Sequence, residues 1–598
     1  MAIPTRSEVP EDLKWDLTRI FKTDQDWENA FDKAKDDVAK LSELKGSLAK
    51  SGKDLYEGLT KILAVKRDVE NIYVYATMSS DVDTSNSHYL GYVSRVQSLS
   101  NQFEAATSFI NPEILSIPAE KFEQFKKDEP RLADYAHYLE MITNKRPHTL
   151  PAEEEKIIAD AGDAMSVSEN TFNVLTNSDM EYGYVQDKDG NMEQLSDGLY
   201  SLLIQSQNRD VRKGAFNTLY ASYGQFQNSL ASTLSGVVKK HNYNARMHKY
   251  DSAREAALAD NGVPVEVYDT LIKEVDSHLD LLHRYVALRK KILGLKDLQM
   301  WDMYVPLTGK PALSYNFEEA KKVTKEALKP LGEDYLKHVD YIFNNRVIDP
   351  VESKGKVTGA YSGGAYDTDP YELLNWEDNI DSLYTLVHET GHSVHSWYTR
   401  HSQPYIYGNY SIFVAEIAST TNENILTEYF LDHITDPKTR AFILNYYLDS
   451  FKGTLFRQTQ FAVFEQFIHE ADAKGEPLTA DILDDVYGQI SQHYYGDSVE
   501  PGGDIALEWS RIPHFYYNFY VYQYATGFAA ATALANKVVH GSQADRDAYL
   551  GYLKSGSSDC PTEIMKRAGV DMTKPDYLKD AFKTFEKRLN EFESLIGK

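Results

Sequence analysis

The pattern of apolar and polar positions along the chain is mostly helical. Residues 23–26, Thr-Asp-Gln-Asp, have the composition of a helix start with an acidic first turn. Apolar side chains then recur at the spacing of one helix face: Trp27, Phe31, Ala34, Val38 and Leu41. Similar patterns continue to about residue 180 and resume from Asp197 to about residue 347. The pattern therefore predicts a mainly α fold.

Two stretches interrupt the helical pattern. Residues 182–195 alternate around a turn at 187–190, which predicts a short hairpin. Residues 355–376 mix glycines with β-forming residues, so they predict a small sheet, and Pro370 favours an edge strand there. We expect two regions along the chain: a helical scaffold or lid over residues 1–195, and a catalytic region over residues 196–598 that contains the small sheet.

Composition narrows the class of protein. The 598 residues include 63 Lys and Arg against 90 Asp and Glu, a net charge of −27. Such an acidic surface argues against nucleic acid or an anionic membrane as a partner. Cys560 is the one cysteine, which excludes an internal disulfide and fits a reducing cytoplasm. Neither a signal peptide nor an apolar run of membrane-spanning length is visible, so we expect a cytoplasmic protein.

The candidate chemistry begins at His388-Glu389-Thr-Gly-His392. On a helix, His388 and His392 lie one turn apart on one face, where two imidazoles can share a single Zn²⁺. Glu389 projects from the same turn and can take a proton from a water at the metal. The pattern has only three fixed positions, so a solvated helix face with two histidines is the alternative.

A third ligand is needed to make this a zinc site. One common arrangement places a histidine six residues after the second, but Tyr398 occupies that position. His395 lies on a similar face, and we favour a buried or supporting role for it. Glu416 and Glu423 follow on a predicted helix and are seven residues apart, hence on one face. We predict that Glu416 is the third ligand and that Glu423 accepts an N–H from His388.

These motifs resemble those of oligoendopeptidase F, within the thimet-oligopeptidase-like metallopeptidases. The resemblance rests on residues 388–395, on Phe413-Val-Ala-Glu416-Ile-Ala-Ser-Thr-Thr-Asn-Glu423, on the opening residues 14–17, and on the strand segments 359–362 and 370–376. It implies a prolate, two-lobed helical body with a deep substrate channel. It also implies one zinc ion per chain and cleavage inside short peptides. In the family, the ligands correspond to His388, His392 and Glu416, and the base to Glu389.

A second stretch, residues 494–527, is rich in tyrosine. Peptide hydrolysis passes through an oxyanion that O–H and N–H donors stabilise, and a histidine and tyrosines suit this role. The resemblance implies that His514 binds substrate, together with two tyrosines seven residues apart, which fit Tyr517 and Tyr524. Tyr520 is an alternative to Tyr517. For Tyr516 and Tyr522 we expect helix packing instead.

The strand segment before the histidines is a further candidate for substrate binding. An edge strand there could hold a peptide backbone by strand addition, through Gly359, Ala360 and Tyr361, although an ordinary small sheet is equally consistent. The function predicted is a zinc endopeptidase acting on short peptides. A zinc carboxypeptidase and a non-catalytic peptide-binding protein are the alternatives, and monomer and dimer both stay open.

Overall fold

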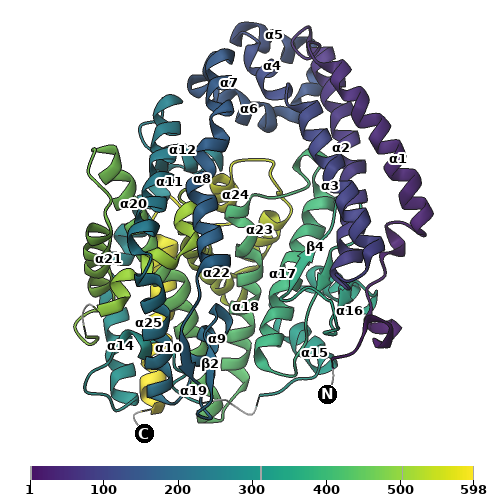
Figure 1. Ribbon diagram of the computed structural model, residues 1–598. Helices are drawn as coiled ribbons and strands as arrows, with labels where there is room; N and C mark the ends of the chain where they lie inside the picture. Colours follow the sequence, from purple (N-terminus) through teal and green to yellow (C-terminus); the bar gives the residue numbers. More distant parts are fainter. Residues whose placement is uncertain (1–2, 310–312, 501–502, 597–598) are drawn as a thin grey trace. The chain divides into compact units, whose positions relative to one another are not determined.

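The structure is a computed structural model that describes residues 3–309, 313–500 and 503–596. Helices make up most of it, and the described residues contain two small sheets and no closed barrel (Figure 1). The prediction of a mainly α fold is therefore confirmed. In the described part of the chain, every helix is too short or too polar to cross a lipid bilayer.

The chain folds into two compact units, each built from separate stretches of sequence. Unit 1 comprises residues 1–147, 313–429 and 534–569, and unit 2 comprises residues 148–312, 430–533 and 570–598. The boundary predicted at residue 195 separates an expected scaffold or lid from an expected catalytic region. That functional division stays a prediction. The channel and lobes implied by the resemblance concern how the units are arranged, and they also stay predictions.

Unit 1 begins with helices that enclose an apolar core of their own. Trp27 is central to this core, because its ring stacks on Tyr92 at 3.7 Å and its indole N–H donates to the carbonyl of Ile72 at 2.9 Å. Thr23 caps the first helix as its sequence predicts. The helices of this stretch are α1 (Asp24–Leu41), α2 (Gly52–Asp81), α3 (Ser87–Thr107), α4 (Ile110–Ser116), α5 (Ala119–Asp128) and α6 (Ala136–Asn144).

The middle stretch of unit 1 carries the small sheet and four helices, of which α17 (Ile380–Ser402) and α18 (Ile412–His433) are the two long ones. The other two are α15 (Phe317–Ala327) and α16 (Glu333–Asn344), and α18 runs a few residues beyond the unit boundary. The last stretch holds the end of α22 (Tyr522–His540), α23 (Gln543–Leu553) and α24 (Pro561–Arg567). The helix α23 packs against α17, so the final stretch forms part of the support of the histidine helix.

The three-stranded sheet lies beside α17. Its strands are β3 (Ile348–Asp349), β4 (Tyr361–Gly363) and β5 (Tyr371–Leu373), in the order β3-β5-β4. The strand after Pro370 is therefore central, and the prediction that Pro370 marks an edge strand is wrong. Pro370 immediately precedes β5, where its missing N–H interrupts no hydrogen bond of the ladder. The two edge strands are β3 and β4, and β4 pairs antiparallel with β5.

Unit 2 is helical apart from one hairpin. The predicted hairpin is confirmed: β1 (Tyr184–Gln186) pairs antiparallel with β2 (Met192–Gln194). The helices of this unit are α7 (Ala152–Asp160), α8 (Gly162–Val174), α9 (Asp197–Leu203), α10 (Arg209–Gly224), α11 (Gln227–Met247), α12 (Ala253–Asp260), α13 (Val265–Asp276), α14 (Leu279–Ile292), α19 (Pro437–Phe451), α20 (Arg457–Ala473), α21 (Ala480–Tyr495), the first part of α22, and α25 (Asp576–Ile596).

Candidate metal centre and aromatic group

The helix α17 carries the two histidines and Glu389. Its start is capped by Asn379, whose side chain accepts from the backbone N–H of Ser382 at 2.8 Å. His388 and His392 lie one turn apart, with their Nε2 atoms 3.2 Å from each other. This is the arrangement expected for residues four positions apart on one helix face.

Glu416 comes to the two imidazoles from α18. Its Oε2 lies 3.3 Å from Nε2 of His388 and 3.5 Å from Nε2 of His392. The three ligand atoms all lie within 4.8 Å of one another. The structure thus brings together the three residues that the sequence singles out as metal ligands. Two imidazoles and a carboxylate are donors that Zn²⁺ prefers in catalytic sites.

Glu423, one heptad further along α18, engages the other nitrogen of His388. Its Oε1 lies 2.5 Å from Nδ1 of His388, so Nδ1 donates to the carboxylate and Nε2 is left facing Glu416. Burial opposes the charged imidazolium, but the carboxylates of Glu416 and Glu423 outweigh it and hold the pKa of His388 well above its ordinary value. The same negative charge would stabilise a cation at Nε2.

The two helices approach closely because of Gly391. A Cβ placed at Gly391 would lie 2.6 Å from Cα of Ser419 and 3.1 Å from the carbonyl oxygen of Ala418. Next to this contact, the side-chain amide of Asn422 donates to the carbonyl of Val387 at 3.3 Å and to the hydroxyl of Tyr335 at 2.9 Å. A glycine in a helix interior costs about 1 kcal/mol against alanine. Here it permits the contact that delivers Glu416 to the histidines.

Glu389 is 7% exposed and lies between the metal ligands and β4. Burial raises its pKa, and the charge of Glu416 adds to this, while His388, His392 and the backbone of Ser362 lower it. The net shift is upward, toward the range that suits a group which takes up and releases a proton near neutral pH. The strand β4 is tied to α17 here, since the hydroxyls of Ser362 and Ser393 lie 2.8 Å apart.

Two residues near this site were not identified from the sequence. Glu372 is fully buried in the central strand β5, and burial is the main cause that raises its pKa to about 8, with Glu389 contributing. A charged residue within the apolar run Tyr371–Leu374 was the available signal. Tyr410 stacks on His395 with ring centroids 3.7 Å apart. His395 itself is buried and lies outside the three-ligand cluster, as we expected.

Unit 2 brings the predicted aromatic residues together. The ring of His514 lies 5.6 Å from Tyr517, 6.1 Å from Tyr520 and 5.9 Å from Tyr524, measured between centroids. Burial lowers the pKa of His514 and favours its neutral form. Tyr517 is 49% exposed, whereas Tyr516 and Tyr522 are buried, so the prediction of helix packing for that pair is confirmed. We call His514, Tyr517, Tyr520 and Tyr524 the aromatic group.

The turn inside the aromatic group is strained. Asn518 and Phe519 have φ of 49° and 58°, a left-handed conformation that non-glycine residues seldom adopt. The buried carboxyl of Glu465, on α20, accepts the backbone N–H of Phe519 at 2.6 Å. Burial raises the pKa of Glu465 to about 8, although the same hydrogen bond lowers it. Glu465 therefore holds the turn that orients Tyr517 and Tyr520.

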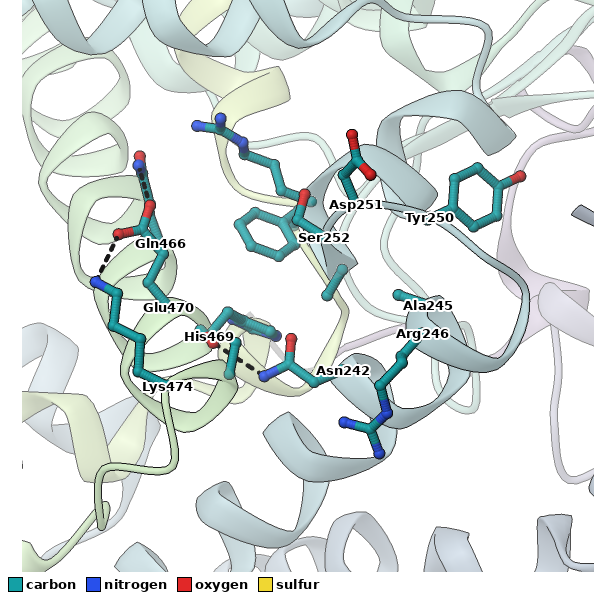
Figure 2. A pocket seen from close by; sticks show the side chains of 14 residues that line it. Asn242, Ala245, Arg246, Tyr250, Asp251, Ser252, Gln466, His469, Glu470 and Lys474 are labelled. Carbon is teal, nitrogen blue, oxygen red and sulfur yellow. Dashed lines mark hydrogen bonds and ion pairs between the residues drawn. The ribbon is translucent and has the colours of Figure 1, made fainter.

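Phe519 also lines a pocket of about 400 Å³ in unit 2. Figure 2 shows its walls, in which Asn242 and Arg246 of α11 face Gln466, His469 and Glu470 of α20. The amide of Asn242 donates to the carbonyl of His469 at 2.9 Å, and this bond holds the two walls together (Figure 2). Phe519 of the strained turn therefore borders this pocket, and its ring lies 4.5 Å from the ring of His469 on α20.

The helical fold and the two-histidine, one-glutamate cluster are those of a metallopeptidase. The family model described as Peptidase family M3 matches residues 202–584, and the model described as Oligopeptidase F matches residues 113–182. The chain belongs to peptidase family M3, in its oligoendopeptidase F group, so the resemblance drawn from the motifs is confirmed. The enzyme class predicted from the sequence, a metalloendopeptidase, is supported by this membership.

Individual relatives are similar to this chain over almost its whole length. Oligopeptidase PepF of Bacillus subtilis (strain 168) is 48% identical over 100% of this chain and 89% of its own. The plasmid-encoded oligoendopeptidase F of Lactococcus lactis subsp. cremoris is 49% identical over 99% of both chains. A crystal structure of oligoendopeptidase-F from Enterococcus faecium is 43% identical and covers 96% of this chain and 99% of its own, with a TM-score of 0.76.

Replacing Gly391 with alanine is expected to weaken metal binding. The added Cβ meets the backbone of α18, which cannot yield as a flexible side chain would, so the two helices must separate by a few tenths of an ångström or more. We expect a loss of about 1–3 kcal/mol in stability and a lower affinity for Zn²⁺, measured by competition with a chromophoric chelator. Gly551→Ala is the matched control, because a Cβ there meets nothing within 4 Å. Equal metal affinity in both variants would contradict this account of Gly391.

Replacing Glu465 with glutamine is expected to stabilise the protein increasingly as pH rises. The folded pKa of about 8 lies above the ordinary glutamate value of 4.5. Between these values the unfolded chain releases a proton that the folded chain keeps, so the contribution of Glu465 to stability falls with rising pH. Glutamine keeps the acceptor for Phe519 and cannot ionise. Thermal unfolding at several pH values between about 5 and about 8 measures the difference. Glu470→Gln, an exposed change on the same helix, is the control, and a pH-independent difference for Glu465→Gln would refute the prediction.

Proposed function

We propose that this protein is a zinc-dependent endopeptidase that hydrolyses internal bonds of short, unstructured peptides. The observation that carries the proposal is the convergence of His388, His392 and Glu416, with Glu389 on the same helix. Membership of a peptidase family favours catalysis over peptide binding alone. The preference for short peptides is inferred from the names of the relatives, oligopeptidase and oligoendopeptidase.

The donor set favours zinc, with one ion at this centre. His388 and His392 supply nitrogen and Glu416 supplies oxygen, which leaves the fourth position of a tetrahedral ion for water or substrate. When bound, such an ion lowers the pKa of a water and polarises a carbonyl group. Glu423 fixes the tautomer of His388, so that Nε2 and not Nδ1 is presented to the metal. A structural zinc site, by contrast, usually closes its fourth position with a further protein ligand.

Glu389 has the position and the environment of the general base. Its buried carboxylate accepts a proton from the water that attacks the scissile carbonyl carbon, and it then carries that proton to the nitrogen of the leaving amine. Burial raises the pKa of Glu389, and a higher pKa makes its carboxylate a stronger base for this transfer. Glu372 is fully buried and lies close enough to Glu389 for the two charges to interact.

We assign substrate binding to two further groups of residues. His514, Tyr517 and Tyr524 offer N–H and O–H donors to the oxyanion, with Tyr520 as the alternative to Tyr517. Gly359 and Ala360 immediately precede the edge strand β4 and Tyr361 begins it, and a peptide can add there as a further strand. The position of a Cβ at Gly359 meets nothing within 4 Å, which leaves room for a neighbouring backbone. A cytoplasmic location is proposed from the single cysteine alone.

Replacing Glu389 with glutamine is expected to leave metal binding intact and to remove turnover. Glutamine has nearly the same shape but cannot accept the proton, and general-base catalysis contributes about 10²- to 10⁴-fold. Metal content by mass spectrometry and kcat on a quenched peptide measure the two effects separately. Glu377→Gln, an exposed change just before α17, is the control. Normal turnover in Glu389→Gln would refute the role of Glu389.

A peptide blocked at both ends tests the mode of cleavage. An endopeptidase cuts an internally quenched peptide with an acetylated N-terminus and an amidated C-terminus, whereas a carboxypeptidase needs a free C-terminal carboxylate. We expect cleavage that stops on chelation and returns when Zn²⁺ is added back. Cleavage of the free-ended peptide alone would identify a carboxypeptidase. No cleavage of a varied peptide set by the zinc-loaded protein would point to a binding protein.

A further inference from the structure

A second group of side chains that can bind a metal lies in unit 1 and shares no residue with the His388, His392 and Glu416 cluster. Ligand atoms of His137, Asp559 and Cys560 all lie within 4.8 Å of one another. His137 is on α6, whereas Asp559 and Cys560 immediately precede α24, so the group joins segments more than 400 residues apart. A nitrogen, an oxygen and a sulfur donor together suit a borderline-soft cation such as Zn²⁺.

Glu140 lies beside this group of three and offers a further carboxylate, although it is not part of the cluster itself. It lies one turn after His137 on α6, and its Oε2 is 3.6 Å from Nδ1 of His137. Its charge also acts on Cys560, since Glu140 is among the groups that raise the pKa of that thiol. Four protein donors would close the coordination of a tetrahedral ion, as in structural zinc sites. The catalytic centre, with three donors, leaves one position open.

One residue, Tyr407, holds both halves of this group in place. Its hydroxyl accepts the backbone N–H of Tyr138 at 3.3 Å, next to His137. Its carbonyl accepts the backbone N–H of Ser557 at 3.3 Å, two residues before Asp559. Gly556 makes the second contact possible, because a Cβ there would lie 2.0 Å from the carbonyl oxygen of Tyr407. The ligands are therefore positioned by the fold.

The loop that carries Asp559 is fixed at its other end by α17. The hydroxyl of Thr399 donates to the carbonyl of Leu553 at 2.9 Å, and the amide of Gln403 donates to the carbonyl of Lys554 at 2.8 Å. The carboxylate of Asp559 is oriented as well, since it accepts from Arg567 at 2.6 Å and from its neighbour's backbone N–H at 2.8 Å. Partners of this kind orient metal ligands in known sites.

The charges around Cys560 favour a cation. Burial raises the pKa of the Cys560 thiol first, and the carboxylates of Asp559, Glu140 and Glu563 raise it further. Without a metal, the thiol is therefore held mostly in its protonated form near neutral pH. A divalent ion reverses this balance, because it neutralises the carboxylates and binds the thiolate directly.

We propose that His137, Glu140, Asp559 and Cys560 form a second, structural metal site that takes Zn²⁺. On binding, a bond forms between the sulfur of Cys560 and the ion, and the thiol proton is released to solvent; no oxidant or reductant is involved. The bound ion links α6 to the loop before α24, and it joins the first and last stretches of unit 1. This site is independent of the catalytic centre, which contains no thiol.

The single cysteine makes the site directly observable. Cobalt(II) bound to a thiolate gives a charge-transfer absorption band, and in this chain only Cys560 can produce it. We expect the metal-free full-length protein to bind two equivalents of Co²⁺ or Zn²⁺, one of them with this band. We also expect saturating Zn²⁺ to slow the reaction of Cys560 with a disulfide reagent by about tenfold or more, because a coordinated thiolate is not free to attack.

Variants distinguish a site with several protein ligands from metal binding by the Cys560 thiol without the other residues. Cys560→Ser should bind one equivalent and keep its peptidase activity, whereas His137→Gln and Asp559→Asn should weaken the band at unchanged thiol content. Glu563→Gln is the matched control, because its carboxylate lies near Cys560 but outside the ligand set. One equivalent in the wild type, or a band unchanged in both His137→Gln and Asp559→Asn, would overturn the proposal.

Discussion

The contact between α17 and α18 at Gly391 is the constraint on which the metal centre depends. The imidazoles come from one helix and Glu416 from the other, so the distance between the helices decides whether three donors can share one ion. Gly391 removes the side chain that would separate them, and Asn422 adds hydrogen bonds across the contact to Val387 and Tyr335. The glycine costs about 1 kcal/mol in helix propensity, and the close contact that it permits places Oε2 of Glu416 within 3.5 Å of Nε2 of both histidines.

Much of this centre could be predicted because the residues that share a helix face are close together in the sequence. The interval of four residues places His388 and His392 on one face, and the interval of seven places Glu416 and Glu423 on another. An acidic pair on an otherwise apolar helix implies a nearby cation, and this requirement relates the second helix to the histidines from sequence alone. For the aromatic group, the family resemblance led to Tyr517, which is exposed in the structure, whereas Tyr516 and Tyr522 are buried.

Features that depend on pairing between distant segments could not be predicted in this way. Pro370 suggested an edge strand, but strand order is decided by β3 and β4, which approach β5 from opposite sides. Glu465 supports the turn at Phe519 from a helix that begins more than 50 residues earlier, and its own sequence neighbourhood contains no sign of this. Tyr407 likewise joins two segments that no periodicity relates.

The discontinuous make-up of unit 1 has a consequence for how the protein is made. The helix that carries the histidines rests on α23, and the hydroxyl of Tyr552 donates to the carbonyl of Val414 at 2.7 Å in α18. A ribosome releases all three metal ligands well before it releases these supporting residues. During synthesis, the ligand helices therefore lack the segment that supports them, and they reach their final packing only after residues 534–569 have emerged. The order of translation thus provides the support of α17 and α18 only after the metal ligands themselves.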